Sequence, residues 1–479
     1  MVSKNNFKKI SNWLWEIPKS FRSDMRVPAR IYTSERILET IEPGALEQVI
    51  NVASLPGIVK YSLAMPDIHT GYGFVIGGVA ATKFPDGVIS PSGIGFDQNC
   101  GVRLLKSNLT YEQIKNHLDE LATKIQAQIP SGLGRGRKTK LSITQINKIL
   151  EEGVPYLVKQ GYGEEEDIEN CESAGRIKQA DASYVSERAK NRGRSQVGTL
   201  GSGNHFIEVQ RVDTIFDEEI AKTFGLFKDQ VVVMIHTGSR GLGHQNCSDY
   251  LKVTAQAMLK YNIKVPDREL SCVPFNSEEG NRFFQAMSAG ANYAWANRQM
   301  ITFYTRQVWK EILGEKQNLH LLYDVAHNIA KVEEHEVDGK KIKLIMHRKG
   351  ATRAFPPNHP EIPRAYQESG QPVLVPGSMG TSSYVLAGTK ESKDAWHTVC
   401  HGAGRTMSRR QAIRTISGQN VVKELKQKGI TVKCWSSRGI AEEAPQAYKD
   451  IESVVDVVHN AKLSKKVAKL VPLAVIKGE

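Results

Sequence analysis

Hydrophobic residues recur every three or four positions along three stretches of the chain, 111–129, 141–158 and 282–313. This spacing places the apolar side chains on one face of a helix, so it predicts three helices that pack against a core. Shorter β-rich runs, which come just before several glycine clusters, predict strands. The predicted strands cover residues 74–79, 231–235, 320–325, 342–346 and 372–375.

Glycine is concentrated in six clusters, each of which lies beside a histidine, cysteine, aspartate, asparagine or arginine. Several clusters follow a predicted strand, so we expect the functional side chains on loops at strand ends, where a rigid scaffold positions them. The clusters occupy residues 71–78, 93–101, 198–203, 238–243, 377–380 and 402–404.

The sequence favours one large domain. No linker rich in proline, glycine and serine separates its halves, and no segment repeats at a fixed period. We therefore predict a mixed α/β (α+β) domain over residues 1–479, with central β-sheets, helices around them and a metal and nucleotide cleft at the strand-end loops. Helical surface insertions are predicted at about 105–165 and 250–315, since both regions lack glycine clusters.

The composition is that of a soluble globular protein, with 40% hydrophobic and 24% charged residues, and it excludes disorder over most of the chain. The 64 basic and 51 acidic residues give a formal net charge of +13, which favours a polyanionic partner. The six cysteines occur singly, which indicates a reducing compartment. Since neither a signal-peptide pattern nor an apolar run of about 18 residues is found, we expect a cytoplasmic protein with no membrane partner.

A first candidate site lies in the segment 92–105, SGIGFDQNCGVRLL. Asp97 and Cys100 are three residues apart in a loop closed by glycines, so a carboxylate and a thiolate can converge on one cation. This pair suits a borderline divalent ion such as Mn, Co, Ni or Zn better than Mg or Ca, which prefer oxygen ligands alone.

Three histidines are candidate partners for this pair. His205 lies in GSGNHFIEVQ, His236 ends an apolar β-like run, and His327 follows the predicted strand 320–325. Histidines at strand ends are good metal ligands because the sheet fixes their direction. The residues alone leave a second interpretation open, in which each is a hydrogen-bonded core or loop histidine.

A second candidate site lies in CHGAGRTMSRRQA, residues 400–412. The small residues after His401 allow a phosphate close to the backbone, Arg405 and Arg409 can neutralise its charge, and the imidazole can act as a nucleophile or general base. A glycine-rich loop at 375–384, VPGSMGTSSY, supplies backbone N–H groups and hydroxyls suited to a phosphate or a nucleobase.

Two further arginines are candidate phosphate contacts. HTGSRGLGH, residues 236–244, lacks the glycine spacing of a dinucleotide-binding fingerprint, which leaves Arg240 as a phosphate contact beside His236. The basic segment 186–194 leads directly into GTLGSGNH, so Arg192 is the best candidate for a contact with a nucleic-acid backbone.

Taken together, these motifs resemble the RtcB family of RNA-splicing ligases, in the right order and from about residue 27 to residue 478. The matching segments are MPDIHTGYGFVIGGVA, GFDQNCGVRLL, GTLGSGNHFIEVQ, HTGSRGLGH, DVAHN, RKGATRAF, PGSMGTSSY, CHGAGRTMSR and AVIKG. At position 98, where we expect an apolar residue in this family, the chain has Gln98, which is not a ligand position.

The resemblance implies an enzyme that joins an RNA 3′-phosphate or 2′,3′-cyclic phosphate end to a 5′-hydroxyl end, using GTP and two Mn²⁺ ions. GMP is transferred first to a histidine and then to the RNA 3′-phosphate, and the 5′-hydroxyl finally displaces it. The partner is RNA with these ends, and the need for an archease-like activator stays open.

The resemblance also implies a role for individual residues. His401 is the guanylylated nucleophile and Asp67 handles the RNA termini. The implied metal ligands are Asp97, Cys100, His205, His236 and His327, with the Cys100 thiolate bridging both ions. The implied guanylate contacts are Asn204, Glu208, Ser382, Ser383, Gly404, Tyr448 and Lys477, and the implied RNA phosphate contacts are Arg192, Arg240 and Arg405.

Two other functions remain as alternatives. The same cysteine, histidine and aspartate residues could serve a metal-dependent RNA phosphatase or nuclease that uses no nucleotide. A non-catalytic RNA-binding protein with a structural metal is the other alternative. Only the ligase should retain covalently bound GMP after incubation with GTP and Mn²⁺.

Overall fold

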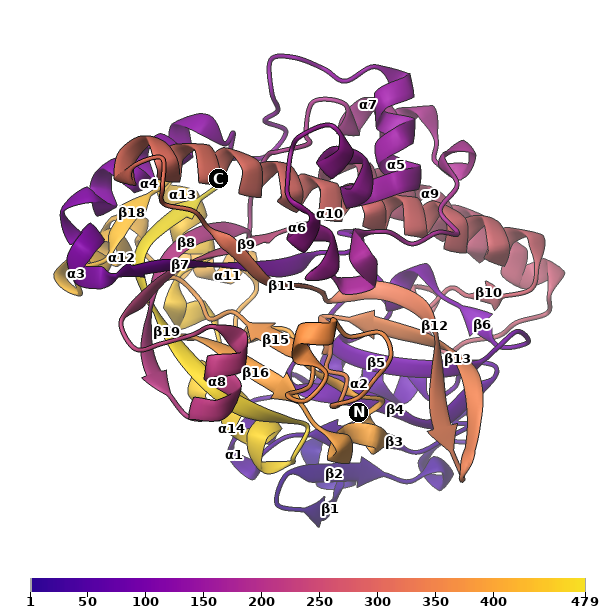
Figure 1. The fold of residues 1–479 in the computed structure, drawn as a ribbon. Coiled ribbons are helices and arrows are strands. Elements are labelled where there is room, and N and C mark those ends of the chain that lie inside the picture. The colour runs from indigo at the N-terminus through magenta and orange to yellow at the C-terminus, as the bar shows by residue number, and fades with distance from the viewer. Residues whose placement is uncertain (1, 479) are drawn as a thin grey trace.

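The computed structural model describes residues 2–478, and over this range most strands belong to two sheets. The first has seven strands in the order β1-β2-β3-β4-β5-β13-β12 within these residues. Helices surround the sheets (Figure 1), so the predicted mixed α/β fold is confirmed. The strands of the first sheet are β1 (Lys8–Ser11), β2 (Leu14–Ile17), β3 (Ala29–Tyr32), β4 (Ile58–His69), β5 (Ile76–Lys83), β12 (Asn328–Val337) and β13 (Lys340–Lys349).

The second sheet carries most of the candidate metal ligands at one edge. Its strands follow the order β11-β7-β9-β8-β19-β16-β15, and β18 pairs with β19 outside this path. Its members are β7 (Gly101–Thr110), β8 (Phe206–Ile215), β9 (Gln230–Thr237), β11 (His320–Ala326), β15 (Pro372–Val375), β16 (Ser383–Gly388), β18 (Thr431–Lys433) and β19 (Ser464–Lys477). Two small pairs join β6 (Val88–Ile89) to β10 (Val273–Pro274) and β14 (Ala351–Arg353) to β17 (Thr398–Cys400).

The helices follow the predicted periodicity, with differences at their ends. The predicted helix 111–129 is divided by a 3₁₀ turn at Lys115–His117. The helical segment predicted at 141–158 is interrupted at Gly153, whose φ of 60° leaves the helical region just before Pro155. The α-helices are α1 (Glu35–Leu38), α2 (Pro43–Val52), α3 (Tyr111–Ile114), α4 (Leu118–Gln128), α5 (Ile143–Lys159), α6 (Glu165–Glu169), α7 (Glu187–Gly193), α8 (Glu218–Phe224), α9 (Arg240–Lys260), α10 (Glu278–Leu313), α11 (Arg409–Thr415), α12 (Gly418–Gln427), α13 (Ser437–Glu442) and α14 (Ile451–Asn460).

The predicted strands all correspond to strands of the structure. β15 coincides with the predicted strand 372–375, and β9, β11 and β13 extend beyond their predicted ends. β5 begins at Ile76, later than predicted, because Phe74 belongs to a tight turn in which its N–H donates to the Tyr72 carbonyl at 2.6 Å. Tyr72 of this turn lines the cavity of the candidate site.

Helix α10 is central to the packing, although it lies in a region predicted to be a surface insertion. It begins at Glu278, earlier than the periodicity predicted, because the Ser277 side chain caps it by accepting from the Gly280 N–H. In Figure 1 it crosses the molecule above β7, β9 and β11, and most of its middle section is buried, including Trp295 and Arg298. Single-domain organisation with insertions stays a prediction, but this helix is a core element.

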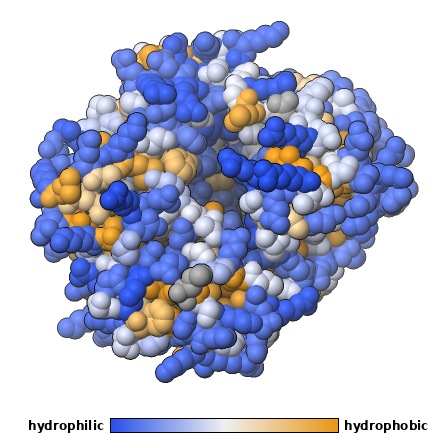
Figure 2. Space-filling model, turned by 180° about the vertical axis from the view of Figure 1, so that it is seen from behind, coloured by the Kyte–Doolittle hydropathy of each residue, from blue (hydrophilic) through white to orange (hydrophobic). Residues whose placement is uncertain are grey.

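The molecular surface is predominantly polar. Figure 2 shows hydrophilic residues over most of one face, a hollow near its centre and smaller hydrophobic patches. Within residues 2–478, the structure contains no helix with the length and apolar character needed to cross a membrane.

Candidate active site

The register of the second sheet brings one residue from each of several strands to the same edge. Gly101 of β7 pairs with Thr237 of β9 and with Ala326 of β11. Across β9, His236 pairs with Phe206, and Phe206 in turn pairs with Lys477 of β19. The residues that directly precede or follow these positions must therefore lie close together, although hundreds of residues separate them in the chain.

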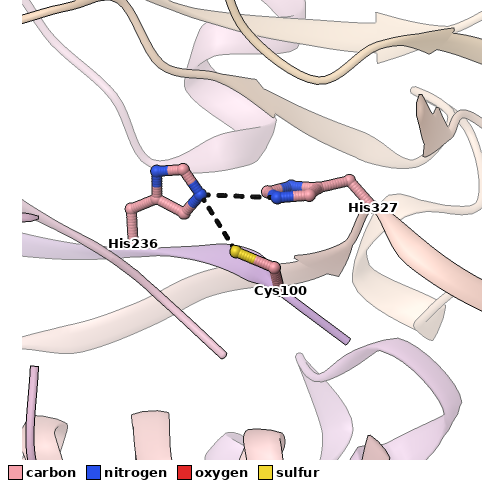
Figure 3. Close-up of side chains that lie close together, drawn as sticks. All are labelled: Cys100, His236 and His327. Carbon is pink, nitrogen blue, oxygen red and sulfur yellow. Dashed lines mark hydrogen bonds between the residues drawn. The ribbon is translucent and has the colours of Figure 1, made fainter. Parts of the chain in front are cut away.

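Cys100, His236 and His327 form the first group of candidate metal ligands at this edge. The Cys100 Sγ lies 3.4 Å from the His236 Nε2, which lies 3.3 Å from the His327 Nε2. Figure 3 shows the thiol and the two imidazoles pointing toward one another. One ligand atom from each residue lies within 4.8 Å of the others, close enough to hold a single ion.

Asp97, Cys100 and His205 form a second group with the same spacing, so Cys100 belongs to both groups. The His205 Nε2 lies 3.4 Å from the Cys100 Sγ and 2.9 Å from the Asp97 Oδ2. The Ser239 N–H donates to the Asp97 Oδ1 at 2.8 Å and fixes the carboxylate. A sulfur shared by two ligand groups can bridge two ions.

The protonation of these side chains fits a cation. The His205 Nδ1 lies 3.1 Å from the Leu200 carbonyl, which can accept a hydrogen bond from it, and the Nε2 that faces Asp97 and Cys100 is then available to bind a cation. Burial lowers the pKa of His236 and of His327 well below the usual value, so both are neutral. In the metal-free protein these atoms lie at hydrogen-bond distance from one another, and the same set of N, O and S donors suits a borderline divalent metal.

Burial by itself would raise the pKa of Asp97, but in the metal-free protein its contacts with His205 and Cys100 and the charge of Arg240 together outweigh burial and lower that pKa. Burial raises the pKa of the Cys100 thiol in the metal-free protein, and the Asp97 charge raises it further. A bound divalent ion reverses this effect, because it stabilises the thiolate.

His401 approaches the cluster from another part of the fold. It follows β17, whose Cys400 pairs with Ala351 of β14. The His401 Nδ1 lies 2.5 Å from the Asp67 Oδ2, and the same oxygen accepts from the His401 N–H at 3.0 Å. The fully buried Asp67 carboxylate thus holds the proton on Nδ1 and leaves Nε2 with a free lone pair. The His401 ring centroid is 4.9 Å from that of His327.

The chain matches the family model described as tRNA-splicing ligase RtcB over residues 48–478. It belongs to the RtcB family. It is 54% identical to the tRNA-splicing ligase RtcB of Thermococcus kodakarensis, with 98% of each chain covered, and 53% identical to that of Methanococcus maripaludis, over 99% of this chain and 100% of the relative. It is also 48% identical to the RNA-splicing ligase RtcB homolog 1 of Entamoeba histolytica, over 96% of this chain and 91% of the relative. The resemblance noted from the motifs is confirmed.

The site of this RtcB family member opens into a cavity of about 860 Å³. Of the residues for which the resemblance implies guanylate contacts, Asn204, Gly404, Tyr448 and Lys477 line it. Lys477 is 3% exposed, and its Nζ donates to the Gly203 carbonyl at 2.7 Å.

The structure places the other implied guanylate contacts outside that lining. Glu208 is buried, which raises its pKa to about 7 although Gln210 donates to it. The Ser383 hydroxyl accepts from the Gln210 side chain and from the Gly377 N–H, both at 3.1 Å. Ser382 lines a second cavity, which shares Tyr448 with the first.

The three arginines implied in RNA binding have different surroundings. Of the three, Arg405 lines the cavity. It donates to Glu443 and to the Tyr448 hydroxyl, both at 3.1 Å. Arg240 is outside the lining and donates to Thr199 at 3.2 Å. Arg192, also outside it, donates to Gln245 at 3.1 Å. The role of these three residues in RNA binding stays a prediction.

The structure adds residues that the sequence analysis missed. The buried Arg298 of α10 donates to the carbonyls of Asn99 and Thr237, both at 2.8 Å, and pairs with Asp324. It thereby fixes the residues next to Cys100 and His236. A charged residue within the apolar periodicity of a long helix was the available signal.

Lys349 is the second missed residue. It lines the cavity, and burial lowers its pKa to about 7. Its position in the RKGATRAF motif, directly before a glycine, was the signal that pointed to it.

Proposed function

We propose that this protein is an RNA ligase that joins an RNA 3′-phosphate or 2′,3′-cyclic phosphate end to a 5′-hydroxyl end at the expense of GTP. The observation that carries the proposal is the contact between Asp67 and the His401 Nδ1, which aims a nucleophilic imidazole into a cavity beside two groups of metal ligands. Membership of a family described as tRNA-splicing ligase supports the RNA substrate.

Asp97, Cys100, His205, His236 and His327 would hold two Mn²⁺ ions, with Cys100 common to both. Bound metal ions neutralise the charge that develops on phosphate oxygens and orient them for in-line attack. The protein contributes a rigid frame for the ligands, since the sheet register and the buried Arg298 fix their backbone.

In the first proposed step, the His401 Nε2 attacks the α-phosphorus of GTP. An N–P bond forms and the bond to pyrophosphate breaks. Asp67 keeps the proton on Nδ1 and compensates the positive charge that the ring acquires. The resulting phosphoramidate is a high-energy linkage, so it can transfer GMP to a weak nucleophile such as a phosphate monoester.

The next two proposed steps involve RNA. An oxygen of the RNA 3′-phosphate attacks the GMP phosphorus, so a P–O bond forms and the N–P bond to His401 breaks. The 5′-hydroxyl then attacks the RNA phosphorus, loses its proton and expels GMP. A cyclic phosphate end first takes up water, which breaks its bond to the 2′-oxygen and leaves the 3′-phosphate.

The decisive experiment incubates the protein with Mn²⁺ and GTP labelled at the α-phosphate, followed by a denaturing gel. We expect the label at the α-phosphate to remain on the protein. With GTP labelled at the γ-phosphate instead, the protein should carry no label. A phosphatase, a nuclease or a non-catalytic RNA-binding protein would retain no label. Joining of labelled RNA ends, with and without an archease-like protein, tests the ligase reaction and the predicted partner.

Replacing Asp67 by asparagine should slow adduct formation by at least about 100-fold, the scale of a lost catalytic proton or charge interaction. The amide preserves the size of the side chain but not the charge that compensates the imidazolium. Adduct formation is followed with labelled GTP, and the Mn²⁺ content of the variant should equal that of the wild type. A wild-type rate would show that Asp67 does not support the nucleophile.

Replacing Lys477 by alanine should reduce the preference for GTP over ATP by roughly 10- to 200-fold. One of its protons is used by the Gly203 carbonyl, and the others can be donated to the guanine O6, where adenine carries an amino group instead. The ratio of kcat/KM for the two nucleotides measures the effect, and Lys469→Ala on the same strand is the control. An unchanged ratio would assign base recognition to Glu208 or to Ser382 and Ser383.

A further inference from the structure

Three aromatic side chains on the cavity wall have no role in the proposed chemistry. Tyr72, Phe96 and His244 all line the cavity, and we call them the aromatic ledge. The Phe96 ring stacks on the His244 ring with centroids 4.9 Å apart, and the Tyr72 ring meets Phe96 edge-on at 5.6 Å. Tyr72 is 39% exposed, so this residue keeps an open surface in the cavity.

The backbone under the ledge is held firmly. The Lys349 Nζ donates to the Tyr72 carbonyl at 2.9 Å, and the Gln48 amide group bonds both the N–H and the carbonyl of Gly71. Gly73 has a φ of 63° that favours glycine, and its N–H donates to Glu269 at 3.1 Å. A binding surface that is ordered in advance loses less conformational entropy when its ligand arrives.

The ledge lies directly beside the reaction centre. Phe96 immediately precedes the candidate metal ligand Asp97, and His244 belongs to α9, the helix that begins after Ser239, which donates to Asp97. Arg192 lies close enough to His244 for its charge to add to the effect of burial in lowering the pKa of that imidazole. The aromatic surface is therefore adjacent to a metal ligand and near a cationic side chain.

We propose that the aromatic ledge binds an unpaired terminal nucleobase of the RNA whose phosphate or hydroxyl reacts at His401 and the metal ligands. This assignment rests on the proposed ligase function. Single-stranded RNA is held by stacking of its bases on aromatic side chains and by cationic groups along its backbone, and stacking tolerates any base. The ledge supplies the stacking surface directly beside a metal ligand, and Arg192, which donates to Gln245 next to His244, supplies a cationic group near it.

The test compares Tyr72→Ala with Phe227→Ala, a matched control whose aromatic ring is 40% exposed and outside the cavity lining. We expect the KM for RNA to rise roughly 5- to 150-fold in Tyr72→Ala, the range measured when a stacking side chain is removed. Phe227→Ala should match the wild type. Formation of the covalent GMP adduct without RNA should be unchanged in both, and Tyr72→Trp should retain RNA affinity.

RNA with an abasic terminal nucleotide separates stacking from a general structural effect. On such RNA the wild type and Tyr72→Ala should have the same KM, because the base that the ring would contact is missing. One substrate carries the abasic nucleotide at the 3′-phosphate end and another carries it at the 5′-hydroxyl end. If the difference in KM between the wild type and Tyr72→Ala disappears for one of these two substrates, the abasic end of that substrate is the end that the ledge binds.

Four outcomes overturn the proposal. If the wild type joins RNA and Tyr72→Ala has the same KM, or if its defect persists on both abasic substrates, the ledge does not bind a terminal base. If the wild type retains GMP from GTP but joins no RNA ends, or forms no adduct at all, the proposed function fails, and the assignment of the ledge fails with it.

Discussion

Replacing Cys100 by alanine is expected to abolish both formation of the enzyme–GMP adduct and RNA joining while the protein stays folded. The Cys100 sulfur belongs to both groups of candidate ligands, 3.4 Å from His205 in one and 3.4 Å from His236 in the other. Mutation of a residue that only supports a metal ligand costs about 10- to 100-fold in affinity or activity. Loss of a shared ligand should therefore lower both activities by more than about 100-fold.

Metal content after desalting and the rate of adduct formation measure this effect together. Cys272→Ala is the control, because Cys272 is also a buried free thiol but lies in a hydrophobic cluster with Val88 and Leu270. The circular dichroism spectrum should be the same for both variants. Near wild-type metal content and turnover in Cys100→Ala would contradict a bridging thiolate.

Replacing His401 by alanine is expected to abolish the covalent adduct but to leave the last step intact. The Nε2 of His401 is needed only to accept GMP, so the variant should still join an RNA that already carries a 3′-diphosphate-guanosine end. The measurement uses labelled GTP for the first step and the activated RNA for the last. An adduct that is labile in acid but stable in alkali identifies a phosphoramidate in the wild type.

His69→Ala provides the control for the His401 variant. Its ring centroid is 6.4 Å from that of His401, and its Nδ1 lies 2.9 Å from the Asp67 carbonyl, so it shares the surroundings of His401 without facing the Asp67 carboxylate. It should still form the adduct. Failure of His401→Ala in both steps would make His401 a metal ligand or a structural residue.

Local patterns were enough to predict several properties of this protein. Helical periodicity located α5 and most of α10, and β-rich runs located β9, β11 and β15. Residue type and neighbouring glycines pointed to His205, His236 and His327 as partners for Asp97 and Cys100. These properties are encoded over a few consecutive residues, because side-chain chemistry and backbone preference act at short range.

Which side chains meet was decided by the tertiary structure. Asp67 and His401 are 334 residues apart, and no periodicity links them. Yet one carboxylate oxygen of Asp67 contacts both the backbone nitrogen and the ring Nδ1 of His401. The aromatic ledge likewise combines a turn after β4, a loop before β7 and the N-terminal part of α9.

The sequence by itself therefore determined the family, the mixed α/β class and the residue types that can carry the chemistry. The tertiary structure decided that Cys100 is shared by two ligand groups, that Asp67 orients His401, and that Arg192 and Arg240 lie outside the lining of the cavity. The physical reason is that strand register and the packing of a buried helix set distances between residues far apart in the chain. A register shift of one residue would turn His236 to the opposite face of its sheet and separate it from Cys100.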